Sequence, residues 1–176
     1  MGQYYKPLII DGSDVIVYNR DVNGEYMVAK LCEHSWWENP AVGKVFNYIK
    51  EHPCIIAWVG DYVENSKIPN TPFTGNQIWD MRDIELETEP LSPMHYFLVN
   101  HSKRMYLDLD LFYKNSINDS RMCMHPLPLL TACGNGLGGG DYYGINECDV
   151  GYWAGDVISV ENHAYEPYEE YKVSFQ

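Results

Sequence analysis

The stretch Cys54-Ile-Ile-Ala-Trp-Val59 is the strongest fold signal in the chain, because it is a continuous apolar run of strand length. A run of this kind, without polar alternation, is typical of a strand that is buried on both faces. Just before it, apolar residues recur at helical spacing from Pro40 to Ile49, and Pro53 ends the pattern. We therefore predict one main amphipathic helix over about residues 40–52, packed against a central strand.

Further strand signals lie on both sides of this helix and strand. Residues 7–11 and 14–18 are rich in β-branched side chains and are separated by Gly12, and Asn23-Gly24 predicts a turn before a third strand. This third strand is expected over 25–31, and additional strands are expected over 94–100, 105–111, 127–132, 152–160 and 171–175. The sequence therefore predicts an α+β fold with a mostly antiparallel sheet.

The length of 176 residues fits a single domain spanning 1–176, and 45% of the residues are apolar, which is ample for a core. Within it, residues 62–93 contain four prolines and several small polar residues. This composition predicts a long surface excursion, a candidate lid, with a short helical turn around 77–81.

The formal net charge of −13, with 12 Lys and Arg residues and no basic run, excludes direct nucleic-acid binding as the main function. An acidic surface favours basic partners, including nucleic-acid-binding proteins whose DNA it would imitate. The chain has no apolar run long enough to span a bilayer and no signal-peptide pattern at its start, so we expect a cytoplasmic protein without a membrane partner.

Five cysteines occur without a Cys-x-x-Cys pair, which argues against a disulfide framework and against a structural zinc site. The six histidines include no His-x-x-x-His pair. We therefore predict reduced cysteines, no metal site and no cofactor.

The run Cys133-Gly-Asn-Gly-Leu-Gly-Gly-Gly-Asp-Tyr-Tyr-Gly144 carries six glycines. It contains Gly-x-Gly-x-x-Gly but lacks the following helix of a dinucleotide-binding fold, and it lacks the Gly-Lys-Ser/Thr of a P-loop. Two interpretations stay open: backbone amides that form a nest for a phosphate or carboxylate, or a tight structural turn under Trp153.

The candidate ligand-binding residues are this segment and the turn after it: Gly134, Asn135, Gly136, Gly138, Gly139, Gly140, Asp141, Tyr142, Trp153 and Asp156. The motif Trp-x-Gly-Asp occurs at 58–61 and again at 153–156. A functional interpretation of this repeat places Asp61 and Asp156 together on one rim of a binding site. Trp58, Asp61 and His125 are accessory candidates, and His125 could form an acid/base pair with Asp141 or Asp156. No serine or cysteine lies in a recognised nucleophile motif, so the sequence gives little support for an enzyme.

Several segments together resemble a family of small, uncharacterised proteins found in bacteria, their phages and large DNA viruses. They are the opening Met-Gly-Gln-Tyr-Tyr, Glu33-His-Ser-Trp-Trp37, Trp58-Val-Gly-Asp-Tyr62, Gly134-Asn-Gly-Leu-Gly-Gly-Gly-Asp-Tyr142 and Val150-Gly-Tyr-Trp-Ala-Gly-Asp156. The resemblance brings no activity with it. It implies a phage, viral or mobile-element setting, and in that case a location in the host cytoplasm.

Taken together, these features predict a binding protein for a small anionic, nucleotide-like ligand, which in a phage would counter host defence by sequestration. The alternative is an acidic interaction protein or DNA mimic that inhibits a host protein, with a purely structural glycine-rich loop. A third hypothesis is a hydrolase or transferase that uses His125, Asp141 and Asp156. The sequence indicates no oligomeric state.

Overall fold

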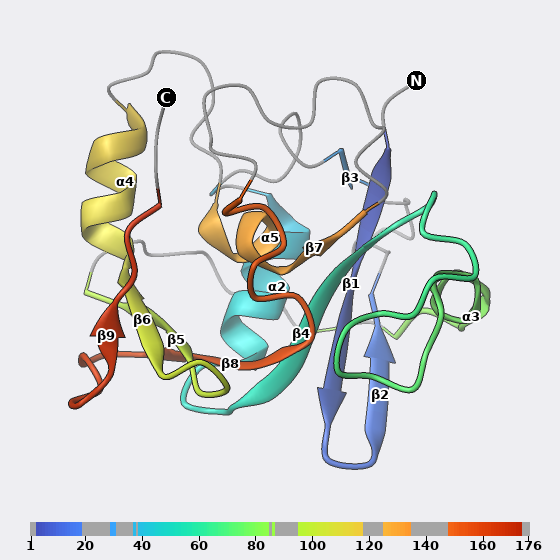
Figure 1. Ribbon diagram of the computed structural model, residues 1–176, viewed down its shortest axis with the longest axis horizontal. Helices are drawn as coiled ribbons and strands as arrows, with labels where there is room; N and C mark the ends of the chain where they lie inside the picture. The colour runs from blue at the N-terminus through green and yellow to red at the C-terminus, as the bar shows by residue number, and fades with distance from the viewer. Residues whose placement is uncertain are drawn as a thin grey trace.

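The computed structural model describes residues 3–18, 29–30, 37, 39–84, 86, 95–117, 125–134 and 148–173. Within them, a single sheet extends across the molecule and carries helices on its faces (Figure 1). Its strands are β1 (Tyr4–Asp11), β2 (Asp14–Val17), β3 (Ala29–Lys30), β4 (Cys54–Gly60), β5 (Phe97–Asn100), β6 (Met105–Asp108), β7 (Ala132–Cys133), β8 (Asp156–Glu161) and β9 (Glu169–Glu170). The helices are α2 (Pro40–Tyr48), α3 (Gly75–Asp80), α4 (Leu109–Ile117) and α5 (Pro126–Thr131).

The strand order is β2-β1-β4-β8-β5-β6-β9, with β3 beside β1 and β7 beside β4. All described pairings are antiparallel except β4 with β7 and β6 with β9. This arrangement confirms the predicted α+β class with a mostly antiparallel sheet.

Strand β4 lies at the centre, as predicted, between β1 on one side and β8 and β7 on the other. Successive side chains of a strand point to opposite faces. Ile56 and Ala57 are both fully buried, so β4 is covered on both faces. The β1–β2 hairpin beside it is also as expected, and Gly12 takes φ 58° in its turn.

Helices α2 and α5 cover one face of the sheet. Their apolar residues join Ile9, Ile56 and Ile158 in the larger core cluster. Helix α2 begins where the Asn39 side chain accepts a hydrogen bond from the backbone N–H of Ala41. It ends at Tyr48 rather than near residue 52, and the chain turns through 49–53 into β4.

Helix α3 covers the opposite face, within the excursion predicted for 62–93. Thr74 and Gln77 form its capping box, and Ile78 packs with Leu8 and Val59 in the second core cluster. The predicted helical turn around 77–81 is therefore confirmed. The described part of the excursion forms a packed layer on the sheet.

The strand predicted over 127–132 is wrong, because residues 126–131 form α5. His125 is the N-cap residue of this helix, and its Nδ1 accepts a hydrogen bond from the backbone N–H of Leu127. Pro126 occupies the first helical position, where a missing N–H carries no penalty. Only Ala132 and Cys133 continue as a strand.

Other predicted strands also differ from the structure. The alternating run at 105–111 ends as a strand at Asp108, and Leu109 begins α4. The strand predicted over 152–160 begins only at Asp156, because residues 152–155 form turns. Tyr171 lies beyond β9, so the strand over 171–175 is wrong in its described part. Of the segment 25–31, the structure describes only β3 as a strand, and residues 25–28 lie outside the described part.

The longest described helices, α2 and α4, have nine residues each. About 20 are needed to cross the hydrocarbon core of a bilayer. Within the described residues, no helix is long and apolar enough to span a membrane.

Candidate functional site

The sheet edge where β1 begins and β4 and β7 end carries Gly134, the first residue of the predicted ligand segment. Val59 pairs with Cys133, so Gly134 continues β7 beside the end of β4. A Cβ atom at Gly134 would lie 2.5 Å from the Tyr5 hydroxyl and 2.8 Å from Oε1 of Gln3. Glycine is needed here because Tyr5 and Gln3 occupy the space of a side chain.

Gln3 is the unusual residue of this edge. Its side chain is fully buried, and its Oε1 accepts a 3.0 Å hydrogen bond from the Tyr5 hydroxyl. Its Nε2, although buried, has no hydrogen-bond partner within the described part of the chain. A buried donor without a partner costs about 1–3 kcal/mol, so Gln3 Nε2 is a feature that requires an explanation.

The other side of the same edge carries an exposed ring and a cation. Tyr4 is 39% exposed, and Nζ of Lys30, its partner in the β1–β3 pairing, lies 5.9 Å from the ring centroid. Asp61 Oδ1 accepts a 3.1 Å hydrogen bond from the backbone N–H of Tyr4. The structure thus brings Asp61 and Gly134 to one edge, through their contacts with Tyr4 and Tyr5.

The central residues of the predicted ligand segment lie outside the described part of the chain. They are Asn135, Gly136, Gly138, Gly139, Gly140, Asp141 and Tyr142. Their assignment to a ligand site stays a prediction from the sequence.

The two tryptophans chosen from the sequence belong to the core. Trp58 is 1% exposed and Trp153 is 0% exposed. The Trp153 ring packs against Tyr171, with 5.4 Å between the ring centroids. A ring without exposed surface cannot contact a ligand, so these two candidate residues have a structural role in the core. The turn before β8 instead exposes the neighbouring Tyr152.

Asp156 is the centre of a buried polar cluster that fastens two loops to β8. Its Oδ1 accepts a 3.2 Å hydrogen bond from Asn70, and its Oδ2 accepts one of 2.8 Å from Asn100. Lys103 forms an ion pair with the same Oδ2. Asp156 is 2% exposed, and these partners give it a structural role.

Asp61 and Asp156 do not share a rim, which corrects the expectation drawn from the repeated Trp-x-Gly-Asp. Asp156 begins β8 opposite Ile56, whereas Asp61 follows the end of β4. Five residues along a strand span roughly 17 Å. The first motif ends a strand and the second precedes one, so the two copies differ in structure.

His125 does not form the proposed acid/base pair with Asp156. It is fully buried, its Nδ1 accepts a hydrogen bond from the backbone N–H of Leu127, and its Nε2 has no partner in the part of the chain that the structure describes. The ring packs against Trp37 and Phe46, with centroid distances of 4.3 and 5.7 Å. Burial lowers the pKa of His125 to about 3, so the ring is neutral at pH 7. Its role is to cap α5.

A second group of polar side chains, missed by the sequence analysis, joins β5 and β8. Ser159 Oγ donates a 2.6 Å hydrogen bond to Glu161 Oε1, and Nε2 of His101 lies 2.8 Å from the same Oγ. Since the hydroxyl proton is directed to Glu161, Nε2 is the donor toward Ser159. A serine nucleophile needs the reverse, a histidine that accepts its proton. Burial lowers the pKa of His101, and we assign these residues a structural role.

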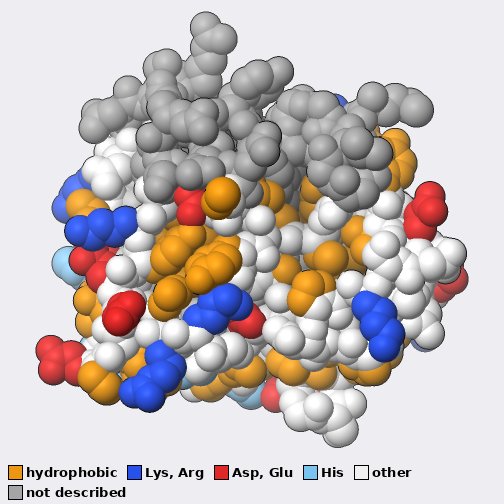
Figure 2. All heavy atoms as spheres, in the orientation of Figure 1, with side chains coloured by type: hydrophobic (Ala, Val, Ile, Leu, Met, Phe, Trp, Pro, Cys, Tyr) orange, Lys and Arg blue, Asp and Glu red, His pale blue; other side chains and the backbone are white. Residues whose placement is uncertain are grey.

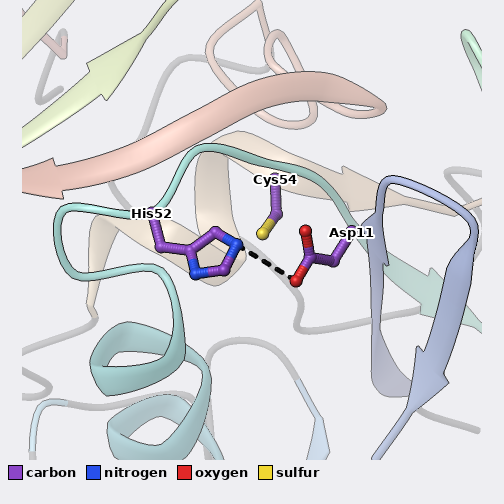
Figure 3. Close-up of side chains that lie close together, drawn as sticks. All are labelled: Asp11, His52 and Cys54. Atoms are coloured by element: carbon purple, nitrogen blue, oxygen red, sulfur yellow. Dashed lines mark ion pairs between the residues drawn. The ribbon is translucent and has the colours of Figure 1, made fainter.

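A third group, also missed, combines three kinds of metal-binding side chain. Asp11 ends β1, His52 follows α2, and Cys54 begins β4 (Figure 3). Asp11 Oδ2 lies 3.0 Å from Nε2 of His52 and accepts a 2.9 Å hydrogen bond from Tyr48. The ligand atoms of Asp11, His52 and Cys54 all lie within 4.8 Å of one another.

The ionisation of this third group follows from its surroundings. The hydrogen bonds from His52 and Tyr48 hold the pKa of Asp11 below its usual value. Burial raises the pKa of Tyr48 to about 12, and the hydrogen bond to Asp11 acts in the same direction. Burial, together with the nearby Asp11, raises the pKa of Cys54 to about 12. The cysteine is therefore a neutral thiol when only these protein groups surround it.

Comparisons with known protein families, with curated proteins and with solved structures found no match.

Proposed function

We propose that the protein binds a small anionic, nucleotide-like ligand at the sheet edge formed by Gln3, Tyr4 and Gly134. The observation that carries the proposal is the buried Nε2 of Gln3, which has no hydrogen-bond partner among the described residues. A ligand oxygen that reached this nitrogen would remove the cost of the unpaired donor. The glycine-rich run that starts at Gly134 supplies additional backbone N–H groups in sequence.

Among the described residues of this edge, Tyr4 offers an exposed aromatic surface for the base of such a ligand. Tyr4 is 39% exposed, and the Lys30 ammonium group lies near its ring. A tyrosine ring stacks on a flat base, and a lysine attracts a phosphate. In this proposal Tyr4, and not the buried Trp153, provides the aromatic surface of the site.

The charge of the protein limits the kind of anion that it can hold. The net charge is −13, and Figure 2 shows the Lys and Arg side chains of the visible face as separate groups rather than a continuous patch. A long phosphate backbone needs many cations in a row. A ligand with few phosphates, bound through local N–H donors, fits this surface better, and we propose binding without turnover in the cytoplasm.

A thermal-shift screen with ATP, GTP, a cyclic dinucleotide and NAD tests the proposal, because a ligand that binds only the folded protein raises its Tm. Tyr4→Ala and Gln3→Met should each abolish the shift given by the parent protein. Tyr152→Ala is the matched control, since Tyr152 is 41% exposed but lies on the turn before β8. A shift that persists in Tyr4→Ala and Gln3→Met, or that disappears in Tyr152→Ala, would place the ligand elsewhere.

The second candidate function is that of an acidic interaction protein that blocks a basic partner, and the net charge of −13 favours it. The two proposals differ in their response to salt. Binding of a basic partner would weaken steeply with ionic strength and would not depend on Gln3. A screen without any nucleotide shift, together with salt-sensitive capture of a basic protein, would favour this second candidate.

A further inference from the structure

The side chains of Asp11, His52 and Cys54 point toward one another at the edge of the sheet opposite to the proposed ligand site (Figure 3). We propose that these three residues bind a divalent transition-metal ion of the zinc type. The inference is independent of the proposed ligand, because the two groups lie at opposite ends of β1.

The donor set determines the class of metal. A thiolate, an imidazole and a carboxylate are the three ligand types that zinc takes from proteins, whereas Mg²⁺ and Ca²⁺ prefer oxygen ligands only. Bonds of about 2.0–2.3 Å to a tetrahedral ion place its ligand atoms roughly 3.3–3.6 Å apart. In this structure Oδ2 of Asp11 lies 3.0 Å from Nε2 of His52, and no two ligand atoms of the group are more than 4.8 Å apart. Small side-chain adjustments would therefore complete the site.

The backbone holds the three donors in place. Ile10 pairs with Ile55 across β1 and β4, so the next positions of the ladder bring Asp11 and Cys54 together. His52 lies two residues before Cys54 and reaches the same place from the turn after α2. Because two of the three donors are at the ends of paired strands, the site is formed by the sheet and not by a free loop.

A neighbouring side chain orients the carboxylate. Tyr48 donates its hydroxyl to Asp11 Oδ2, and its ring stacks on the His52 ring with 5.7 Å between the centroids. Partners of this kind fix the direction of metal ligands and are a regular part of metal sites.

The exposure of the donors indicates how an ion would enter and what it would face. The side chain of His52 is 50% exposed and that of Asp11 is 28% exposed, whereas Cys54 is 2% exposed. The sulfur therefore binds from the core side and the other two donors from the rim. Three protein ligands leave the fourth position of a tetrahedral ion to water from the solvent side, the arrangement found in catalytic zinc sites.

The same three residue types also form the nucleophilic triads of cysteine hydrolases, but the geometry here is different. In such a triad the histidine uses one ring nitrogen for the acid and the other for the nucleophile. Nε2 of His52 faces Asp11, and one ligand atom from each of the three residues lies within 4.8 Å of the other two. The buried Cys54 also lacks the exposure that a nucleophile needs.

Titration of the full-length protein with Co²⁺, a spectroscopic substitute for Zn²⁺, tests the proposal. We expect one equivalent of Co²⁺ to give the strong visible bands of a tetrahedral site and a near-ultraviolet thiolate-to-cobalt band, and Zn²⁺ to displace it. Cys54→Ser should eliminate the thiolate band, and His52→Ala should weaken binding at least tenfold. The half-exposed position of His52 makes its replacement compatible with folding, so this variant decides the test if Cys54→Ser is unstable.

His95→Ala provides the matched control, because Nδ1 of His95 lies 4.0 Å from Asp110 and forms a second histidine–carboxylate pair outside the three-residue group. This variant should bind Co²⁺ as the parent does. Cys148, which is exposed, is replaced by serine in a further control for adventitious thiol binding. A parent without the thiolate band, or a band that is lost with Cys148→Ser and kept in Cys54→Ser, would overturn the proposal.

Discussion

Tyr48 donates a 2.9 Å hydrogen bond to Oδ2 of Asp11, the carboxylate oxygen that also faces His52. If this contact orients a metal ligand, Tyr48→Phe should weaken Co²⁺ binding about 10- to 100-fold. The absorption bands should stay at the same wavelengths, because the ligands are unchanged. Competition with a chelator measures the affinity. Equal affinity in the parent and in Tyr48→Phe would show that the hydroxyl does not support a metal ligand.

His125 makes the stability of the protein sensitive to acid. Burial lowers its pKa from 6.5 to about 3 in the folded protein, so the unfolded chain binds the proton more readily. The neutral His125 therefore contributes to the free energy of unfolding, and this contribution is fully present above pH 6.5. It is lost as the pH falls from 6.5 toward 3, by about 1.4 kcal/mol per pH unit. Urea unfolding of the parent at pH 7, 6, 5 and 4 measures this slope.

His125→Asn is the matched variant for this prediction. Asparagine caps a helix as well as histidine does here, but it does not titrate. The variant should be less stable at pH 7, because a smaller side chain leaves a gap beside Trp37 and Phe46. Its stability should nevertheless fall less steeply between pH 6 and 4 than that of the parent. Parallel curves for the two proteins would contradict the assignment.

Gly155 should tolerate no side chain. It takes φ 75°, and a Cβ atom there would lie 1.8 Å from the backbone oxygen of Pro69. Gly155→Ala is therefore expected to lower the free energy of unfolding by about 3 kcal/mol or more. Gly12→Ala separates the two causes, because Gly12 has φ 58° but nothing within 4 Å of its Cβ position. Gly12→Ala should lower the free energy of unfolding by about 1–2 kcal/mol. Equal losses of stability for Gly12→Ala and Gly155→Ala in thermal unfolding would contradict the predicted clash.

Removal of Asp156 should be costly because its three partners depend on one carboxylate. We expect Asp156→Ala to lower the free energy of unfolding by about 3 kcal/mol, since a buried ion pair and two hydrogen bonds are lost together. Glu170→Gln, which removes the exposed partner of Lys172, should change it by less than about 0.5 kcal/mol. Chemical denaturation compares the two variants. Similar small losses would show that Asp156 is not the fastening point of the two loops.

The parts of the fold that the sequence predicted well are those with one dominant pattern. The uninterrupted apolar run at 54–59 and the β-branched pair of strands before it fit only a buried strand and a hairpin. The run at 127–132 was ambiguous, because six buried residues, five of them apolar, suit a strand or a short helix equally. The N-cap histidine and the following proline were the local signals that favoured the helix.

The metal-type group was not predictable from spacing alone. His52 and Cys54 are two residues apart, but Asp11 reaches them only through the pairing of β1 with β4, which a single sequence does not specify. Conversely, the prominent Trp153 was overrated as a binding residue. A large aromatic side chain beside glycines is found both in binding pockets and in cores, and Trp153 lies in the core.

Among the described strands, β9 forms one end of the sheet, and it consists only of Glu169 and Glu170, both exposed. A free strand edge offers its backbone groups to any other chain that can extend the ladder. Two adjacent carboxylates make a second copy of the chain an unfavourable neighbour at neutral pH, and the short length leaves few groups to pair. The charge and the short length of β9 therefore protect this edge of the sheet against pairing with a second copy of the chain.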